Sequence, residues 1–254
     1  MLLDSTIKSD QATRYLLHRG WVILPPKQEG IVHFSVKDPR DLTWVCVPKY
    51  DSSPYWWRML QYTSIILSRV EKRPVKDVLD DLLNPLSDKI SFRIKSSSTT
   101  LGSVPLSSFS KLFSGVTGIL KSAVKDIETP EKEHKRLWGK SIKKLMDSAQ
   151  FGQTKKGSFV FNIYVPVVED NELNLYRKVV IHILDSFASL TDEKWNKKAS
   201  VNLYRSLCQM DLWEDMVIDI AVKWSPLFPA SGHTRTKVHL SRDAIWLAKE
   251  EACR

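Results

Sequence analysis

Two hydrophobic periods alternate along the chain and divide it into helices and strands. Residues 9–20 (SDQATRYLLHRG) place apolar side chains at helical spacing, and Gly20 is expected to end that helix. Three short apolar runs bounded by Pro, Gly and Asp then predict three strands: WVILP, IVHFSVK and LTWVCVP. We expect one helix with Pro54 at its first position, and another opened by Pro74 and closed by Asn84-Pro85.

After residue 86 the pattern predicts the order strand, helix, helix, strand, helix, helix, strand, strand, helix. KISFRIK alternates with Ile90, Phe92 and Ile94 on one face, and VIDIAVKW and TKVHL also alternate. SFVFNIYVPV is interpreted as a central strand that is apolar on both faces. We therefore expect an α+β fold with a largely antiparallel or mixed sheet and several flanking helices. Its organisation is either two lobes, 1–85 and 86–254, or one continuous domain.

The segment FSKLFSGVTGILKSAVKDI predicts a strong amphipathic helix. Its apolar stripe comprises Phe109, Leu112, Phe113, Val116, Ile119, Leu120, Ala123, Val124 and Ile127. Lysines lie off the stripe, as they do in helices that bind a membrane surface, but a core helix has the same pattern. The chain has ample apolar partners to bury such a stripe, so a core helix is the favoured interpretation.

Charge suggests the class of partner. The formal net charge of +9 and a pI near 9.4 indicate an anionic partner, with nucleic acid and anionic membranes as the usual candidates. No apolar run approaches the ~20 residues that span a bilayer, and no signal peptide is visible at the start, so we expect a cytoplasmic location. The three cysteines share no zinc-type spacing, and we expect neither a metal site nor a cofactor.

The densest cluster of positive charge lies between residues 132 and 156, where eight basic and two acidic residues give a surplus of +6. On a helix, four of these cations would share one face. The turn that follows would extend the same surface, with a serine able to donate to a phosphate oxygen. The predicted phosphate contacts are Arg136, Lys140, Lys143, Lys144, Lys155, Lys156 and Ser158. The alternative is a solvated helix face and an exposed turn without a ligand.

Strand parity predicts a second basic surface. If the alternating strands are neighbours, the polar face of their sheet carries Lys89, Arg93, Lys95, Lys223, Arg235 and Lys237. Such a face could follow a nucleic-acid backbone, although no stacking aromatic residue is assigned to it. Helices could equally cover it. The sequence leaves open whether the two basic surfaces are contiguous.

Signals for catalysis are weak. A metal-dependent nuclease needs clustered carboxylates with a lysine, and the nearest approach is Asp219 with Lys223, four positions apart on one strand face. No Walker loop, GxGxxG, HExxH or GxSxG is present. The adjacent Trp56 and Trp57, with Tyr55 and Tyr62, could instead form a partner interface, with one Trp in the core and the other nearer the surface.

The segments FGQTKKGSFVFNIYVPV, SVNLYRSL and VIDIAVKWSP resemble a family of bacterial proteins with a Gly-Gln-Thr-x-x-Gly-Ser turn before an apolar strand. The resemblance implies a place in a multi-gene bacterial system, antiviral ones among them, and transfers no activity. Gln153 and Thr154 would form the turn or contact a ligand. We therefore expect a DNA- or RNA-binding accessory subunit of a multi-protein complex that does not catalyse a reaction. A protein-binding scaffold and an atypical nuclease around Asp219 are the alternatives.

Overall fold

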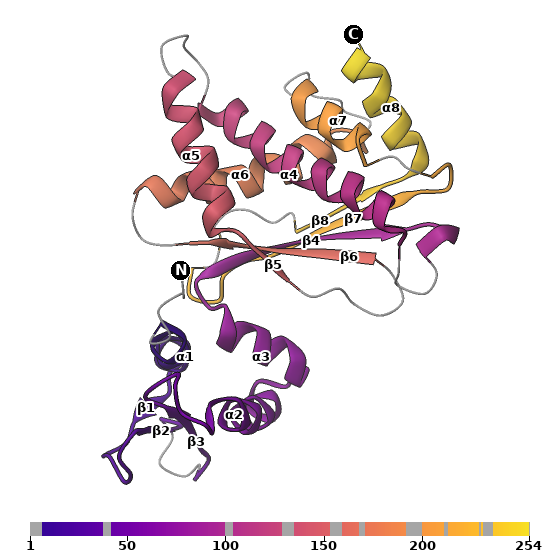
Figure 1. Ribbon diagram of the computed structural model, residues 1–254. Coiled ribbons are helices and arrows are strands. Elements are labelled where there is room, and N and C mark those ends of the chain that lie inside the picture. Colours follow the sequence, from indigo (N-terminus) through magenta and orange to yellow (C-terminus); the bar gives the residue numbers. More distant parts are fainter. Residues whose placement is uncertain are drawn as a thin grey trace. The chain divides into compact units, whose positions relative to one another are not determined.

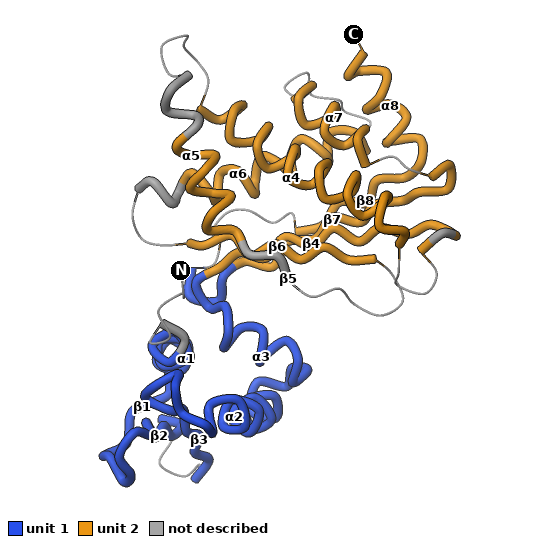
Figure 2. Tube along the Cα trace, in the orientation of Figure 1, with its two compact units in different colours: residues 1–86, 225–229 blue, residues 87–224, 230–254 orange. Residues whose placement is uncertain are grey.

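The chain divides into two compact units, which a computed structural model describes separately (Figure 2). The described residues are 7–37, 42–99, 104–128, 135–152, 159–167, 171–191, 200–210, 213–228, 230 and 236–253. Unit 1 comprises residues 1–86 and 225–229, and unit 2 comprises residues 87–224 and 230–254. The segment 225–229 is part of unit 1, where Ser225 Oγ donates a hydrogen bond to the carbonyl of Pro85 at 2.6 Å.

Unit 1 packs three helices against a three-stranded antiparallel sheet of order β1-β2-β3 (Figure 1). Its elements are α1 (Ile7–His18), β1 (Val22–Ile23), β2 (Ile31–Ser35), β3 (Trp44–Pro48), α2 (Trp56–Glu71) and α3 (Val75–Leu83). Apolar residues from every layer form one core, among them Tyr15, Phe34, Val47, Leu60 and Val78. This order of elements is the one that the sequence predicts.

The helix ends of unit 1 agree with the sequence in one case and differ in another. Gly20 follows α1 with φ +83°, a backbone conformation that glycine adopts without strain, so the predicted stop is confirmed. The predicted start of α2 is wrong, because Pro54 lies in a turn closed by the Trp56 N–H and the Ser53 carbonyl at 3.0 Å. Trp56 packs against the core and Trp57 is 50% exposed, as expected for adjacent positions on a helix.

Unit 2 is built on a five-stranded sheet of order β5-β6-β4-β7-β8, in which every pairing is antiparallel. Its strands are β4 (Ser87–Lys95), β5 (Gln150–Gly152), β6 (Phe159–Pro166), β7 (Val217–Lys223) and β8 (Lys237–Leu240). Its helices are η1 (Ser97–Thr99), α4 (Leu106–Glu128), α5 (Lys135–Ser148), α6 (Asn171–Ala188), α7 (Val201–Cys208) and α8 (Arg242–Cys253). The α+β class predicted from the alternating segments is confirmed.

The helices α4 to α8 lie on one side of this sheet and cover its inner face (Figure 1). The inner face is apolar, with Phe92 and Phe161 directly opposite each other and fully buried. One charged residue, Asp88, also points inward, and its carboxylate is satisfied by Arg177 of α6 at 2.7 and 2.9 Å. A buried carboxylate requires such a partner, so this pair fixes α6 against the sheet.

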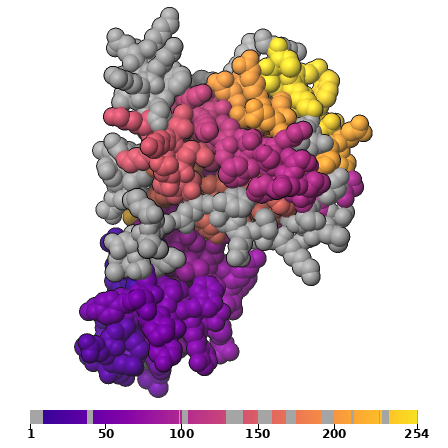
Figure 3. Space-filling view, in the orientation of Figure 1, coloured from indigo at the N-terminus to yellow at the C-terminus, as the bar shows by residue number. Residues whose placement is uncertain are grey.

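The apolar stripe of α4 packs into the core of unit 2, as the favoured interpretation of the sequence predicted. Leu112, Val116, Ile119 and Val124 are buried there, while the other side of the helix reaches the surface (Figure 3). Phe113 departs from the prediction and is 42% exposed, because the stripe assigned from the sequence is wider than the part of the helix that contacts the core. No helix within the described ranges is long and apolar enough to cross a membrane.

Candidate nucleic-acid interface

The face of the unit 2 sheet that α4 to α8 do not cover, called here the outer face, gathers cations from three adjacent strands. Lys89, Arg93 and Lys95 alternate along β4, the central strand. The antiparallel register sets Lys89 opposite Lys223 of β7, and Ala221 of β7 opposite Lys237 of β8. Directly paired residues project to the same face of a sheet, so these five cations share the outer face. Arg235 lies outside the described residues.

Exposure differs across this surface. Arg93, Lys95 and Lys237 are exposed, and Lys89 and Lys223 are half-buried. Val160 and Asn162 of β6 also belong to the outer face, opposite Arg93 and Ser91, yet both are buried. Ser91 Oγ donates a hydrogen bond to Asn162 Oδ1 at 2.8 Å, which satisfies that buried amide oxygen. The accessible part of the basic surface therefore follows β4, β7 and β8.

Asp219 is the carboxylate on the described part of the outer face, and it lies opposite Arg93 and His239 in the register. Its oxygens contact Lys95 Nζ at 2.6 Å and His239 Nδ1 at 2.7 Å. Partial burial raises the pKa of the Asp219 carboxyl, but the hydrogen bonds from Lys95 and His239 outweigh it, so that the pKa lies below its ordinary value. Asp219 thus compensates Lys95, and four further described cations lie on the same face.

An aromatic residue that the sequence interpretation missed lies on the same face. Tyr164 of β6 pairs with Lys89, and the Lys89 ammonium lies 5.2 Å from the centroid of the Tyr164 ring. The interpretation of residues 158–167 as apolar on both faces concealed it. In the structure Phe159, Phe161, Ile163 and Val165 point to the core, while Asn162 and Tyr164 point outward. The expectation that this face lacks an aromatic residue is therefore wrong.

The other predicted basic surface lies on the helical side of the sheet. In α5, Leu145 is buried in the core, whereas Lys140, Lys143 and Lys144 are exposed and share the predicted face. Arg136 lies in the first turns of α5, where the structure describes the backbone alone. Lys155, Lys156 and Ser158, with Gln153 and Thr154, lie outside the described residues. α5 lies on the side of the sheet opposite the outer face, so the two groups of described cations are carried by opposite sides of the sheet (Figure 1).

The Asp215 carboxylate, just before β7, is engaged by hydrogen-bond donors. Asp215 accepts hydrogen bonds from Ser96 Oγ and from the Ser97 N–H, both at 2.6 Å. These donors lower the pKa of Asp215 to about 2. Asp219 and Lys223 do share a strand face, as predicted, but the lysine in contact with Asp219 is Lys95. Within the described ranges no group of three or more His, Cys, Asp and Glu side chains is arranged to hold a metal ion.

Comparison with known proteins adds no relative. No family model, no curated protein and no solved structure matches the chain. The resemblance to bacterial proteins with the Gly-Gln-Thr-x-x-Gly-Ser turn therefore stays a prediction, and the functional argument depends on the outer face itself.

Proposed function

We propose that the chain binds single-stranded nucleic acid on the outer face of the unit 2 sheet and does so without catalysing a reaction. The observation that carries this proposal is the register of β4, β7 and β8, which places five Lys and Arg residues on one face with a single described carboxylate. Phosphate contacts from such residues supply sequence-independent affinity. We further propose that the chain acts as an accessory subunit of a multi-protein bacterial system, as the resemblance implies.

Several features of the outer face favour a single strand over a duplex. A helix can enter the major groove of a duplex, and the described basic residues that a helix carries are those of α5. The outer face is a sheet surface, which does not present such a helix. Tyr164 offers a ring on which a base can stack, with Lys89 beside it to contact the backbone. Ser91 and Asn162 satisfy each other next to this ring. A surface of cations, one aromatic ring and few free hydrogen-bonding groups suits binding with little sequence preference.

The test compares two double variants that remove the same charge from opposite sides of the sheet. Arg93→Gln/Lys237→Gln removes two exposed cations of the outer face, and Lys140→Gln/Lys143→Gln removes two from α5. Fluorescence anisotropy measures binding of labelled single-stranded DNA, single-stranded RNA and duplex DNA between about 50 and 200 mM salt. We expect the outer-face variant to flatten the slope of log K against log salt for single strands by about 1.4, which corresponds to two lost contacts.

The matched α5 variant decides between the two surfaces. We expect its slope for single strands to equal that of the parent chain. A flattened slope in the α5 variant alone would assign the phosphate contacts to the helix, as the sequence first indicated, and reject the outer face. A parent chain that binds none of the three probes at low salt would reject the nucleic-acid function itself.

A further inference from the structure

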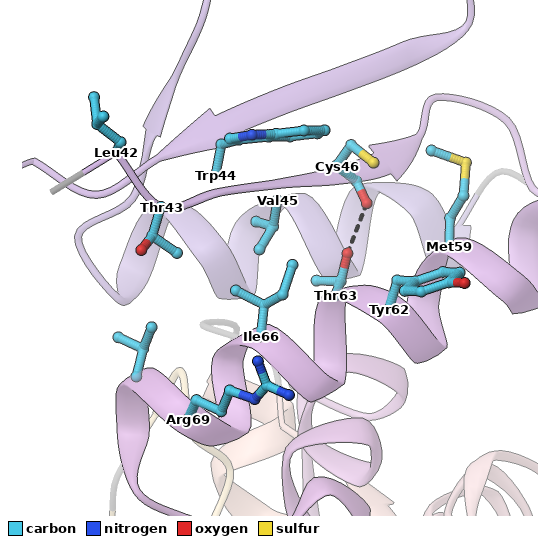
Figure 4. A pocket seen from close by; sticks show the side chains of 11 residues that line it. Leu42, Thr43, Trp44, Val45, Cys46, Met59, Tyr62, Thr63, Ile66 and Arg69 are labelled. Atoms are coloured by element: carbon cyan, nitrogen blue, oxygen red, sulfur yellow. Dashed lines mark hydrogen bonds between the residues drawn. The ribbon is translucent and has the colours of Figure 1, made fainter.

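Unit 1 contains an apolar groove of about 600 Å³ between β3 and α2, called here the β3–α2 groove (Figure 4). The groove is lined by β3 residues of both parities. Trp44 and Cys46 point to one face of the sheet and Val45 to the other. A cavity that contacts both faces of one strand lies along the edge of that strand. β3 is an edge strand of the described sheet, so the groove follows its unpaired side.

The hydrogen-bonding register shows which backbone groups face the groove. The Val36 N–H donates to the Thr43 carbonyl, and the Lys49 N–H donates to the Gly30 carbonyl at 2.8 Å. In an antiparallel pair the residues alternate between facing the partner and facing away. Thr43, Val45, Val47 and Lys49 therefore face β2, and Trp44, Cys46 and Pro48 present their backbone groups to the other side.

Two of these outward carbonyls are already occupied. Thr63 Oγ1 of α2 donates to the Cys46 carbonyl at 2.7 Å, and Ser9 Oγ donates to the Pro48 carbonyl. The Thr63 contact ties α2 to β3 within the lining of the groove, and Met59 and Tyr62 line it beyond this contact (Figure 4). Within the part of the chain that the structure describes, neither the N–H nor the carbonyl of Trp44 has a hydrogen-bond partner. An edge strand with such groups is a template for one more strand.

The side chains around Trp44 define the chemistry of an occupant. Leu42, Trp44 and Tyr62 line the groove and are 88%, 55% and 58% exposed. Arg69 of α2 is the cation among the lining residues; it is exposed, has no ion pair with a described residue, and has no acidic residue beside it in the lining. The groove thus combines apolar walls, an open backbone donor and acceptor, and one positive charge.

We propose that the β3–α2 groove binds an extended peptide segment of a partner protein, which pairs with the backbone of Trp44 as an additional strand. Apolar side chains of the segment contact Leu42, Tyr62 and Ile66, and a carboxylate of the segment pairs with Arg69. Strand addition derives affinity from main-chain hydrogen bonds and specificity from alternate side chains. An amphiphile with an apolar tail and an anionic head group could pair with Arg69 but would leave the Trp44 N–H without an acceptor, so the open backbone favours a peptide.

The experiment uses the full chain and a random peptide library displayed on phage. We expect the selected peptides to show apolar residues at alternate positions with an Asp, a Glu or a free C-terminal carboxyl. One selected peptide, synthesised with a fluorophore, is then titrated with the parent chain, Arg69→Glu and Arg58→Glu. Arg58 is the matched control, since it is exposed on α2 and does not line the groove.

Loss of a charge-assisted hydrogen bond should weaken binding to Arg69→Glu by roughly tenfold or more. Arg58→Glu should stay within about twofold of the parent, because Arg58 lies roughly 16 Å from Arg69 along α2 and exposed charges beyond a Debye length are screened. Hydrogen exchange of the Trp44 amide should slow when the peptide binds. The proposal is overturned if no peptide is enriched, if both variants respond equally, or if exchange at Trp44 is unchanged. Arg69→Glu should leave oligonucleotide binding intact, so this test and that of the outer face fail independently.

Discussion

Arg73 of unit 1 and Arg93 of unit 2 both lie near carboxylates, but among the described residues Arg73 forms ion pairs with them and Arg93 does not. Arg73 contacts Glu71 at 2.7 Å and Asp81 at 2.5 Å, and Asp81 is nearly buried. Burial lowers the pKa of Arg73, but Asp81 and Glu71 outweigh this and hold it above its ordinary value. Arg93 lies directly opposite Asp219, whose oxygens contact Lys95 and His239 instead.

The difference separates structural charge from charge that is available to a ligand. The Tyr15 hydroxyl also donates to Glu71, at 3.0 Å, so the Arg73 cluster holds α1, α2 and α3 together. On the outer face the cations outnumber the described carboxylate, and most of them remain accessible. The net charge of the sequence does not distinguish cations that are paired in the fold from cations that are available to a ligand. A basic composition therefore indicates an anionic partner only to the extent that the cations lack carboxylate partners in the fold.

The largest effect is expected where charge is structural. Asp81→Ala leaves Arg73 without its most buried partner and should lower the free energy of unfolding by about 3–5 kcal/mol, measured by urea titration. Asp10→Ala is the control, because Asp10 pairs with Arg14 at 2.8 Å on the surface, where such pairs contribute about 0.3–0.5 kcal/mol.

If Asp81→Ala does not fold, the double variant Arg73→Met/Asp81→Leu keeps the prediction testable. Replacement of both charges by apolar groups should restore folding, because Asp81 and Arg73 are removed together and Glu71 keeps Arg19 and the Tyr15 hydroxyl as partners. Similar small losses for Asp81→Ala and Asp10→Ala would show that the Arg73 cluster is no more structural than a surface pair.

The sequence predicted which side chains of each strand share the outer face, but not the order of the strands in the sheet or the presence of Tyr164 on that face. Alternation along residues 89–95 and 217–223 shows which side chains of each strand share a face. It does not show which strands are neighbours, and the position of Lys237 beside Ala221 depends on the tertiary register. Tyr164 was missed because its strand lies inside the sheet, where buried Val160 on the outer face makes both faces look apolar.

The basic face of α5 shows a different limit of prediction from sequence. Helical spacing correctly placed Lys140, Lys143 and Lys144 on one exposed face. Spacing along a helix carries no information about which side of a sheet the helix packs on, so the separation of this face from the outer face was not predictable. The groove in unit 1 could not be predicted from the sequence for a similar reason, since it depends on where α2 crosses the edge of β3. Of the aromatic residues interpreted from the sequence as a possible partner interface, Tyr62 lines the groove and Trp56 and Trp57 do not, whereas Trp44 was not part of that interpretation.

An intermediate effect is expected where one carboxylate competes with a ligand. Asp219→Asn releases Lys95 and should steepen the salt slope for single-stranded nucleic acid by about 0.7, equivalent to one added contact. Stability should change by less than about 1 kcal/mol, since Lys95 is half exposed. Glu250→Gln, an equal charge change at an exposed position of α8, should leave the slope unchanged. Magnesium-dependent cleavage that Asp219→Asn abolishes would instead make Asp219 catalytic.

The smallest expected effect concerns the Asp215 carboxylate. Its hydrogen-bond donors are neutral, so it neutralises no cation of the outer face. Asp215 accepts from Ser96 Oγ and the Ser97 N–H, and its pKa is about 2. Because this folded-state pKa is depressed, its contribution to stability is present above the ordinary Asp value of about 3.9 and is lost as pH falls toward 2.

Ser96→Ala removes the side-chain donor and should raise the pKa of Asp215 toward that ordinary value, as followed by NMR titration of the carboxyl carbon. The pKa of Asp219, which depends on Lys95 and His239, should stay where it is and provides the internal control. A shift of both carboxyls would mean that the donors at the start of β7 and the cations of the outer face form one coupled network. In that case Asp215 would also compensate outer-face charge, and the distinction between structural and available charge would fail at that edge of the sheet.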